Sequence, residues 1–242
     1  MSRWLFLVLA FGIGCAGRQT PDGSQEVVVS PIPVPQPVYA REELSTDLQE
    51  LWKRVEEAVA VRPPEPPEGA SEDAIGEWAE GEFRDWLLQR QAATDRALSA
   101  TTALRTNPLF ERGIGTALFG YMYEDMAGSI RGAPVPESIA KDAELLEIYT
   151  SALTEHITPF AELSARAYYA CLALFVKLDD PQWGEWAYYC DQRGAEVVDT
   201  FELQPPEPTD TSTTVTQLVT PRYRGRAVRS EGRLEAGSPF RG

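Results

Sequence analysis

Residues 159–199 carry the strongest structural pattern in this sequence and read PFAELSARAYYACLALFVKLDDPQWGEWAYYCDQRGAEVVD. In the first half of this segment, apolar residues recur every three or four positions, which places them on one face of a helix. They are Phe160, Leu163, Ala167, Cys171, Leu174 and Leu178. The second half repeats the spacing with Trp183, Trp186, Ala187, Cys190, Gly194 and Val197. The pattern predicts two helices joined by a tight turn.

The turn is predicted at Leu178-Asp179-Asp180-Pro181, where the apolar spacing is interrupted. An aspartate before a proline is typical of a helix N-cap followed by the first helical residue. The other faces of the first helix are also apolar, with Tyr168, Tyr169, Leu172, Phe175 and Val176. A helix that is hydrophobic nearly all round is normally buried, so this helix is predicted to be the central one.

Cys171 and Cys190 lie equally far from the predicted turn, because the midpoint of their numbers falls between Asp180 and Pro181. Residues equidistant from the turn lie side by side in an antiparallel hairpin, and both cysteines fall on the apolar faces. Small residues on the same faces would allow the close approach that a disulfide needs. We therefore predict a Cys171–Cys190 disulfide, and two buried free thiols are the alternative.

The helical period also runs through residues 41–158, with proline-rich breaks between segments. The stripe of the first segment is Leu44, Leu48, Leu51, Val55 and Val59. Ser71 is predicted to cap a long helix that reaches about Thr106, and further helices are predicted to begin at Asn107-Pro108 and at Ser138. The stripe of the last one is Ile139, Ala143, Leu146, Tyr149, Leu153 and Ile157. Pro159 is expected to end this helix or to kink it.

Three glycines, Gly113, Gly115 and Gly120, fall in the segment that follows Pro108. Each lowers helix propensity by about 1 kcal/mol relative to alanine. They also remove bulk, so close packing against a neighbouring helix is the expected compensation.

Residues 41–203 are thus predicted to form one all-α domain. It is expected to be an irregular bundle of five or six helices with a disulfide-linked C-terminal helical hairpin. No run alternates between apolar and polar residues for long enough to predict a strand in this range.

The N-terminus has the pattern of an export signal. The positive Met1-Ser2-Arg3 precedes an apolar run, Trp4 to Ile13, which is too short to span a bilayer and is typical of a signal peptide. The run ends in Gly12-Ile13-Gly14-Cys15, which resembles the lipobox of bacterial lipoproteins. The alternative is an ordinary secretory signal with a chance cysteine.

The resemblance to lipoproteins implies cleavage after residue 14 and lipid attachment, including acyl chains such as palmitate, at Cys15. Gly12 departs from the family pattern, where leucine is usual. The absence of aspartate after Cys15 implies the outer membrane rather than the inner one. The expected location is the bacterial cell envelope, lipid-anchored in the outer membrane and facing the periplasm, where a disulfide can persist.

The domain is predicted to have two low-complexity flanks. Residues 15–40 are rich in proline between Pro31 and Pro37, and are predicted to be either a spacer from the membrane or simply a disordered N-terminus. Residues 204–242 are predicted to be a disordered tail, and six arginines against two glutamates make residues 221–242 basic.

Composition argues against several functions. The net charge of −15 argues against nucleic-acid binding, which needs lysine and arginine to neutralise phosphates. With one histidine, His156, and the cysteine pair oxidised, no usual metal site can be assembled, and no cofactor is predicted. No common catalytic motif is present. The carboxylate pairs Glu124-Asp125 and Asp179-Asp180 are interpreted as solvated faces and caps.

Protein contact is the remaining function class. Of the aromatic residues near the turn, Trp183 and Trp186 are predicted to be core, whereas Tyr188 and Tyr189 are a candidate contact surface, with core alone as the alternative. The hairpin around Pro181 resembles one tetratricopeptide-type unit, with Ala167 and Leu178 in matching places. No second copy at a fixed period accompanies it. This resemblance implies a helical scaffold for protein contacts.

The prediction for function is therefore a membrane-anchored envelope lipoprotein that acts as a non-enzymatic structural or protein-interaction module. Its expected partners are the membrane, through the lipid anchor, and an envelope protein, but not nucleic acid. The alternative is a helical envelope enzyme that acts on cell-wall glycan or peptide. A glycan-cleaving enzyme would need two carboxylates at a defined separation.

Overall fold

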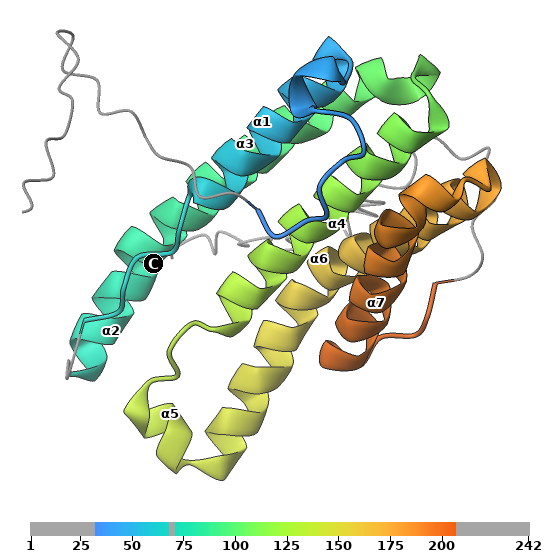
Figure 1. The fold of residues 1–242 in the computed structure, drawn as a ribbon. Coiled ribbons are helices and arrows are strands. Elements are labelled where there is room, and N and C mark those ends of the chain that lie inside the picture. Colours follow the sequence, from blue (N-terminus) through green and yellow to red (C-terminus); the bar gives the residue numbers. More distant parts are fainter. Residues whose placement is uncertain (1–31, 68–70, 207–242) are drawn as a thin grey trace, which may run out of the picture.

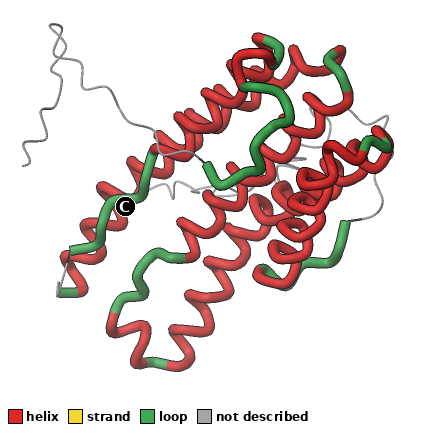
Figure 2. The backbone as a smooth tube through the Cα atoms, viewed as in Figure 1, coloured by secondary structure: helices red, strands yellow, loops and turns green. Residues whose placement is uncertain are grey.

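The structure is a computed structural model, and it describes residues 32–67 and 71–206 (Figure 1). Its helices are α1 (Thr46–Ala60), α2 (Glu72–Trp78), α3 (Arg84–Ala100), α4 (Leu109–Arg131), α5 (Glu137–Lys141), α6 (Ala143–Leu178) and α7 (Gly184–Thr200). Short helical turns at Arg41–Glu43, Ala79–Phe83, Thr101–Thr106 and Pro181–Trp183 extend or join them. The described residues contain no strand, so they confirm the predicted all-α fold (Figure 2).

Helix α4 lies in the middle of the bundle. It has α1 and α3 on one side and α6 and α7 on the other (Figure 1). Of its 23 residues, 14 are buried, whereas 10 of the 20 residues 159–178, the predicted central helix, are buried. That segment packs on both α4 and α7, but α4 has the larger buried share. Val176 of that helix is 66% exposed, because α7 and α4 cover only part of its circumference.

Helix α1 begins at Thr46, a few residues after the start of the helical period at Arg41. The Ser45 hydroxyl accepts a hydrogen bond from the Leu48 N–H, and the predicted stripe of α1 is buried throughout. Ser45 also donates its N–H and its hydroxyl to the buried carboxylate of Glu111, which Asn107 Nδ2 contacts as well. Asn107 therefore binds side chains instead of capping α4, which begins at Leu109.

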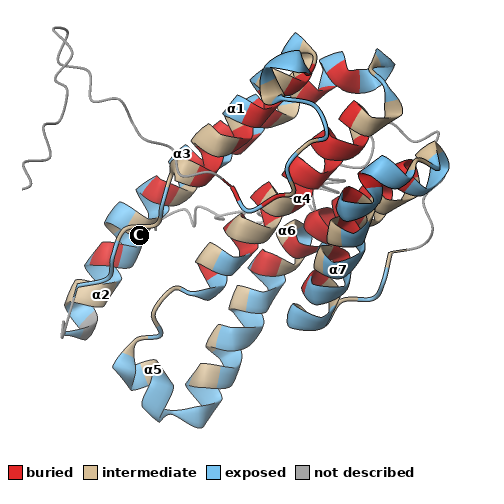
Figure 3. Cartoon of the chain, viewed as in Figure 1, coloured by how far each residue is buried: buried red, intermediate tan, exposed pale blue. Residues whose placement is uncertain are grey.

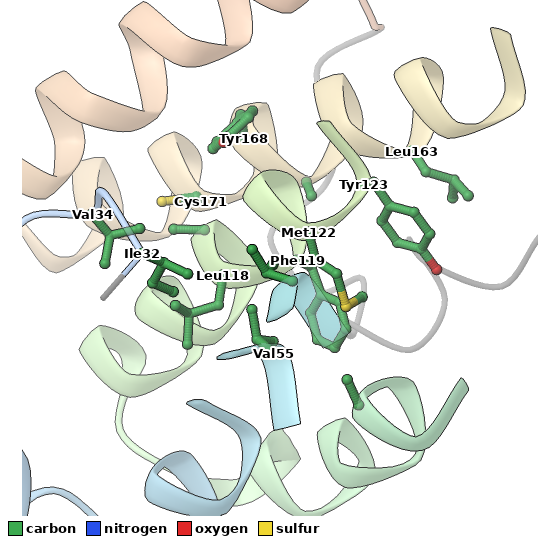
Figure 4. Close-up of a cluster of buried hydrophobic side chains, with 14 of the residues drawn as sticks. Ile32, Val34, Val55, Leu118, Phe119, Met122, Tyr123, Leu163, Tyr168 and Cys171 are labelled. Atoms are coloured by element: carbon green, nitrogen blue, oxygen red, sulfur yellow. The ribbon is translucent and has the colours of Figure 1, made fainter. Parts of the chain in front are cut away.

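The segment before α1 packs on the domain. Ile32 and Val34 are buried among side chains of the core (Figure 4). The Trp186 indole N–H donates to the Gln36 carbonyl (3.2 Å), and the Tyr39 ring contacts Trp183. The expectation that residues up to 40 hold little core is therefore wrong from Ile32 onward, because tertiary packing provides sites for single aliphatic residues between prolines.

Several predicted helix boundaries change. The helix expected from Ser71 to Thr106 does begin at that cap. A π-helical turn at Ala79–Phe83 separates α2 from α3, and a 3₁₀ turn at Thr101–Thr106 follows α3. The cap expected at Ser138 is wrong, because α5 follows Pro136 and α6 begins after Asp142, whose carboxylate accepts backbone N–H groups. Helix α6 continues through Pro159 as one helix of 36 residues. One lost backbone hydrogen bond is tolerated where the following residues are packed against α4 and α7.

The C-terminal hairpin matches its prediction. Asp179 ends α6 in the left-handed conformation (φ 50°), and the Asp180 side chain accepts the Gln182 N–H at 3.1 Å. Cys171 and Cys190 form the predicted disulfide, with a Cα–Cα distance of 6.0 Å. The structure therefore confirms the disulfide-linked hairpin.

The glycines of α4 allow the close helix packing that the sequence predicts. At Gly120, α4 approaches α6 so closely that the Ser164 hydroxyl donates to the Gly120 carbonyl at 2.8 Å. A Cβ at Gly120 would lie 2.7–2.9 Å from the Tyr168 ring, and one at Gly113 would lie 2.6 Å from Phe175. Both rings are buried and have little room to move.

We expect Gly120→Ala to lower the free energy of unfolding by about 1–3 kcal/mol, because the added methyl overpacks the contact between α4 and α6. Urea denaturation measures the change. Gly128→Ala is the matched control on the same helix, since a Cβ there meets no atom within 4 Å. It should stabilise by about 0.5–1 kcal/mol, because alanine has less unfolded-state entropy to lose. Equal effects at both positions would contradict the packing explanation.

Candidate functional site

The residues that the sequence singled out do not converge on one site. Cys15 lies outside the described residues. Tyr188 is 66% exposed on α7, whereas Tyr189 is partly buried and packs edge-on against Tyr168, with ring centroids 5.9 Å apart. The two neighbours therefore point in different directions, and only Tyr188 presents most of its ring to solvent.

Tyr189 belongs to a polar cluster that joins α4, α6 and α7. The Tyr168 hydroxyl donates to Glu124 Oε2 at 2.8 Å and lies 3.5 Å from the Tyr189 hydroxyl. Arg193 donates to both oxygens of Glu124 and to Glu196. Each side chain in the cluster thus has a polar partner on another helix or one turn away.

A second polar cluster joins α1, α3 and α4 around Arg90, whose side chain is fully buried. Arg90 donates to the backbone carbonyls of Ala58 and Met122, and to Asp125 Oδ2 at 2.8 Å. Asp125 is paired a second time, with Arg62 at 3.0 Å. Burial lowers the pKa of Arg90, and the charge of Asp125 opposes that shift.

Tyr121 lies on the face of α4 between these two clusters. Burial raises its pKa, and so does the negative charge of Asp125. It lines an open hollow of about 390 Å³ together with Glu124, Asp125, Gly128 and Ser129. Tyr121 and the nearby Arg90 of α3 both have shifted pKa values, which makes this face of α4 the natural place to look for catalysis.

The geometry of this face favours a structural role. Glu124 and Asp125 are both held by arginines, so the interpretation of this pair as solvated residues is wrong. Sequence spacing could not reveal these partners, which are 35 to 69 residues away. A carboxylate locked by arginine is poorly placed to act as a general acid. Among the described residues, no group of three or more metal-ligating side chains could hold an ion.

The other predicted polar positions have simple surroundings. Asp179 and Asp180 cap the hairpin turn, as the sequence predicts. His156 is exposed on α6.

Stability is expected to fall as the pH rises above 10. Burial raises the pKa of Tyr189 to about 12 and raises that of Tyr168 well above its ordinary value. In the unfolded chain both phenols lose their protons near pH 10, so above that pH the native state binds more protons and stability declines. Below about pH 10 this contribution is fully present.

Tyr189→Phe should reduce this decline, because one phenol no longer titrates. Urea midpoints at about pH 9 and about pH 11 measure the effect. Tyr188→Phe is the matched control, since that ring is mostly in solvent. An equal reduction by both variants would contradict the assignment to the buried phenol.

Two exposed large apolar side chains lie close together on a projecting arm, defined here as α5 and residues 143–156 of α6 (Figure 3). Leu145 and Ile148 are 47% and 59% exposed, and Ala152 is exposed one turn further on. These residues have the spacing i, i+3, i+7, which places them on one helix face. They form the arm face, the candidate contact surface.

The arm corrects the predicted core stripe of residues 139–157. Only Ile157 of that stripe is buried, and the other members are partly or fully exposed. The arm extends beyond α4, so little of the domain lies opposite it (Figure 3). Leu145 and Ile148 were not singled out from the sequence. They could have been noticed in the sequence, because they add apolar residues to a second face of this helix, away from the predicted stripe.

The arm also has a charge pattern. It carries four carboxylates, Glu137, Glu144, Glu147 and Glu155, beside the Asp142 cap, against one lysine.

None of the helices in the described part of the chain has the length and apolar character to cross a membrane. Comparison of the chain with protein-family models, with curated proteins and with solved structures finds no match.

Proposed function

We propose that this chain is a lipid-anchored envelope protein whose helical domain is a non-enzymatic protein-interaction module. The observation that carries the proposal is the arm face, where Leu145, Ile148 and Ala152 form an exposed apolar row. Such a row is the anchor pattern of a helix that docks in an apolar groove of a partner. The carboxylates beside it favour a partner whose groove has a basic rim.

The lipobox-like segment supports the location. It implies attachment at Cys15 in the outer membrane, with the domain in the periplasm, so the partner is expected to be an envelope protein. The alternative, an enzyme acting on cell-wall material, has less support, because Glu124 and Asp125 both form ion pairs with arginines and are poorly placed to act as a general acid or base.

Crosslinking in intact bacterial cells tests the contact. A photoreactive amino acid at Ile148 should yield a specific adduct with an envelope protein, and Leu145→Glu should abolish that adduct. Val176 is the matched control position, since it is equally apolar and 66% exposed on the same helix but outside the arm. Absence of an adduct at 148, or the same adduct at 176, would refute the arm face as the contact.

Cell fractionation tests the anchor separately. Cys15→Ser removes the thiol to which the lipid is expected to be attached, so it should release the protein from the membrane pellet. Each acyl chain contributes about 0.8 kcal/mol per buried methylene to membrane binding, and the variant would lose this contribution. Ser2→Ala, which leaves Cys15 intact, should stay in the pellet. Wild-type protein in the soluble fraction would show that the lipoprotein prediction is wrong.

A further inference from the structure

A pocket of about 260 Å³ lies at the base of the arm. Three elements form it: the end of α4, the middle of α6 and the residues that close α7. Arg131 comes from the first, Thr154 and Ile157 from the second, and Phe201 and Glu202 from the third. None of these residues takes part in the two polar clusters of α4 or in the arm face.

Arg131 lies at the exposed rim of this pocket, and no acidic partner for it is found within residues 32–67 and 71–206. Its Nη1 donates to the Thr200 carbonyl at 2.7 Å, and its guanidinium lies 5.5 Å from the centre of the Phe201 ring. No carboxylate of the described residues forms an ion pair with it, although carboxylates far outnumber cations in this chain. A positioned guanidinium with unused N–H donors is suited to bind a carboxylate.

The remaining lining has a polar rim and an apolar floor. Ile157 is buried, and Leu153 lies beside it, so together they offer aliphatic surface. The rim carries the hydroxyls of Thr150 and Thr154, both on exposed residues of α6. An apolar floor with a few convergent polar groups is the common composition of small-ligand sites.

Glu202 completes the pocket from an unusual backbone conformation. It lies in the left-handed region with φ 52°, two residues after Thr200, the last residue of α7. The Leu203 N–H closes this helix end on the Val198 carbonyl at 2.9 Å, which is a turn that glycine usually occupies. The helix end itself does not need a glutamate, and the Glu202 carboxylate lies on the rim of the pocket.

We propose that this pocket binds the carboxylate end of an aliphatic α-amino acid. Arg131 holds the carboxylate, Glu202 accepts from the adjacent nitrogen, and the side chain lies on Ile157. The ligand is either a free amino acid or the C-terminal residue of a peptide, since both present these groups. The inference is independent of the proposed partner contact on the arm face.

Saturation-transfer NMR on the full chain in detergent micelles tests the proposal with four probes. L-leucine and N-acetyl-L-leucine carry the carboxylate, and L-leucinamide and N-acetyl-L-leucinamide lack it. At least one carboxylate probe should bind with millimolar affinity, the range of ligands with about nine heavy atoms. Tighter binding of L-leucine identifies a free amino acid, and equal or tighter binding of N-acetyl-L-leucine identifies a chain terminus.

Variants connect the signal to the pocket. Arg131→Gln should weaken carboxylate binding roughly tenfold or more, and Thr154→Leu should block it by filling the space. Arg105→Gln, an exposed arginine elsewhere, is the matched control and should bind as wild type. Unchanged melting temperatures show that the variants are folded. The proposal is overturned if no carboxylate probe binds, if the amides bind equally well, or if Arg131→Gln and Thr154→Leu both leave binding intact.

Discussion

Asp125→Ala is expected to lower the free energy of unfolding by about 3–5 kcal/mol, the range for removing one partner of a buried ion pair. The reason is Arg90, whose guanidinium has no solvent contact and would keep only the carbonyls of Ala58 and Met122 as acceptors. Because these contacts join α1, α3 and α4, an uncompensated charge there weakens the centre of the bundle. Urea denaturation of the full chain measures the loss.

Two further variants separate the buried charge from other effects. Arg62 is the outer partner of Asp125, and its side chain is 57% exposed. Arg62→Gln should therefore lower the free energy of unfolding by less than about 1 kcal/mol. The double variant Arg90→Met/Asp125→Leu replaces the buried pair by apolar side chains and should recover much of the stability. A double variant as unstable as Asp125→Ala would show that the loss comes from packing and not from the unpaired charge.

The Cys171→Ala/Cys190→Ala variant is expected to lose about 3 kcal/mol, the chain-entropy value for a loop closed over 19 residues. Both cysteines are buried between α6 and α7, so alanine also leaves some unfilled space. The loss should appear as a lower urea midpoint. A reducing agent should lower the midpoint of the wild type and leave that of the variant unchanged.

Thiol labelling provides the direct test of this bond. Protein matured in the periplasm and denatured without reductant should not be labelled at Cys171 or Cys190. After reduction both positions should be labelled, which is the control for access of the reagent. Labelling of both before reduction would establish two free thiols instead.

Features that depend on neighbours a few residues apart could be predicted from the sequence. The caps at Ser71 and Asp180 follow from local hydrogen bonds between a side chain and the next turn. The Cys171–Cys190 disulfide is a longer contact, but a single turn sets its register, so counting outward from Pro181 was sufficient. The glycines of α4 also signalled close packing, although not which rings they would meet.

Features that depend on which helices meet could not be predicted in this way. Arg90 and Asp125 are 35 residues apart, and no spacing rule connects them. The segment at Ile32 looked like part of a spacer, because the surface that buries it comes from distant helices.

The sequence by itself therefore determined the all-α class, the C-terminal hairpin with its disulfide, and the helix-forming segments, because these follow from local periodicity and from one turn. Only the tertiary structure decided that α4 is central, that residues 143–156 project as an arm, and that Arg131 and Glu202 share a pocket. The physical reason is that an apolar helix face shows which side chains favour burial, whereas those side chains are buried only where another helix packs against that face. On the arm that surface is missing, so an apolar pattern typical of core residues becomes a surface for contact.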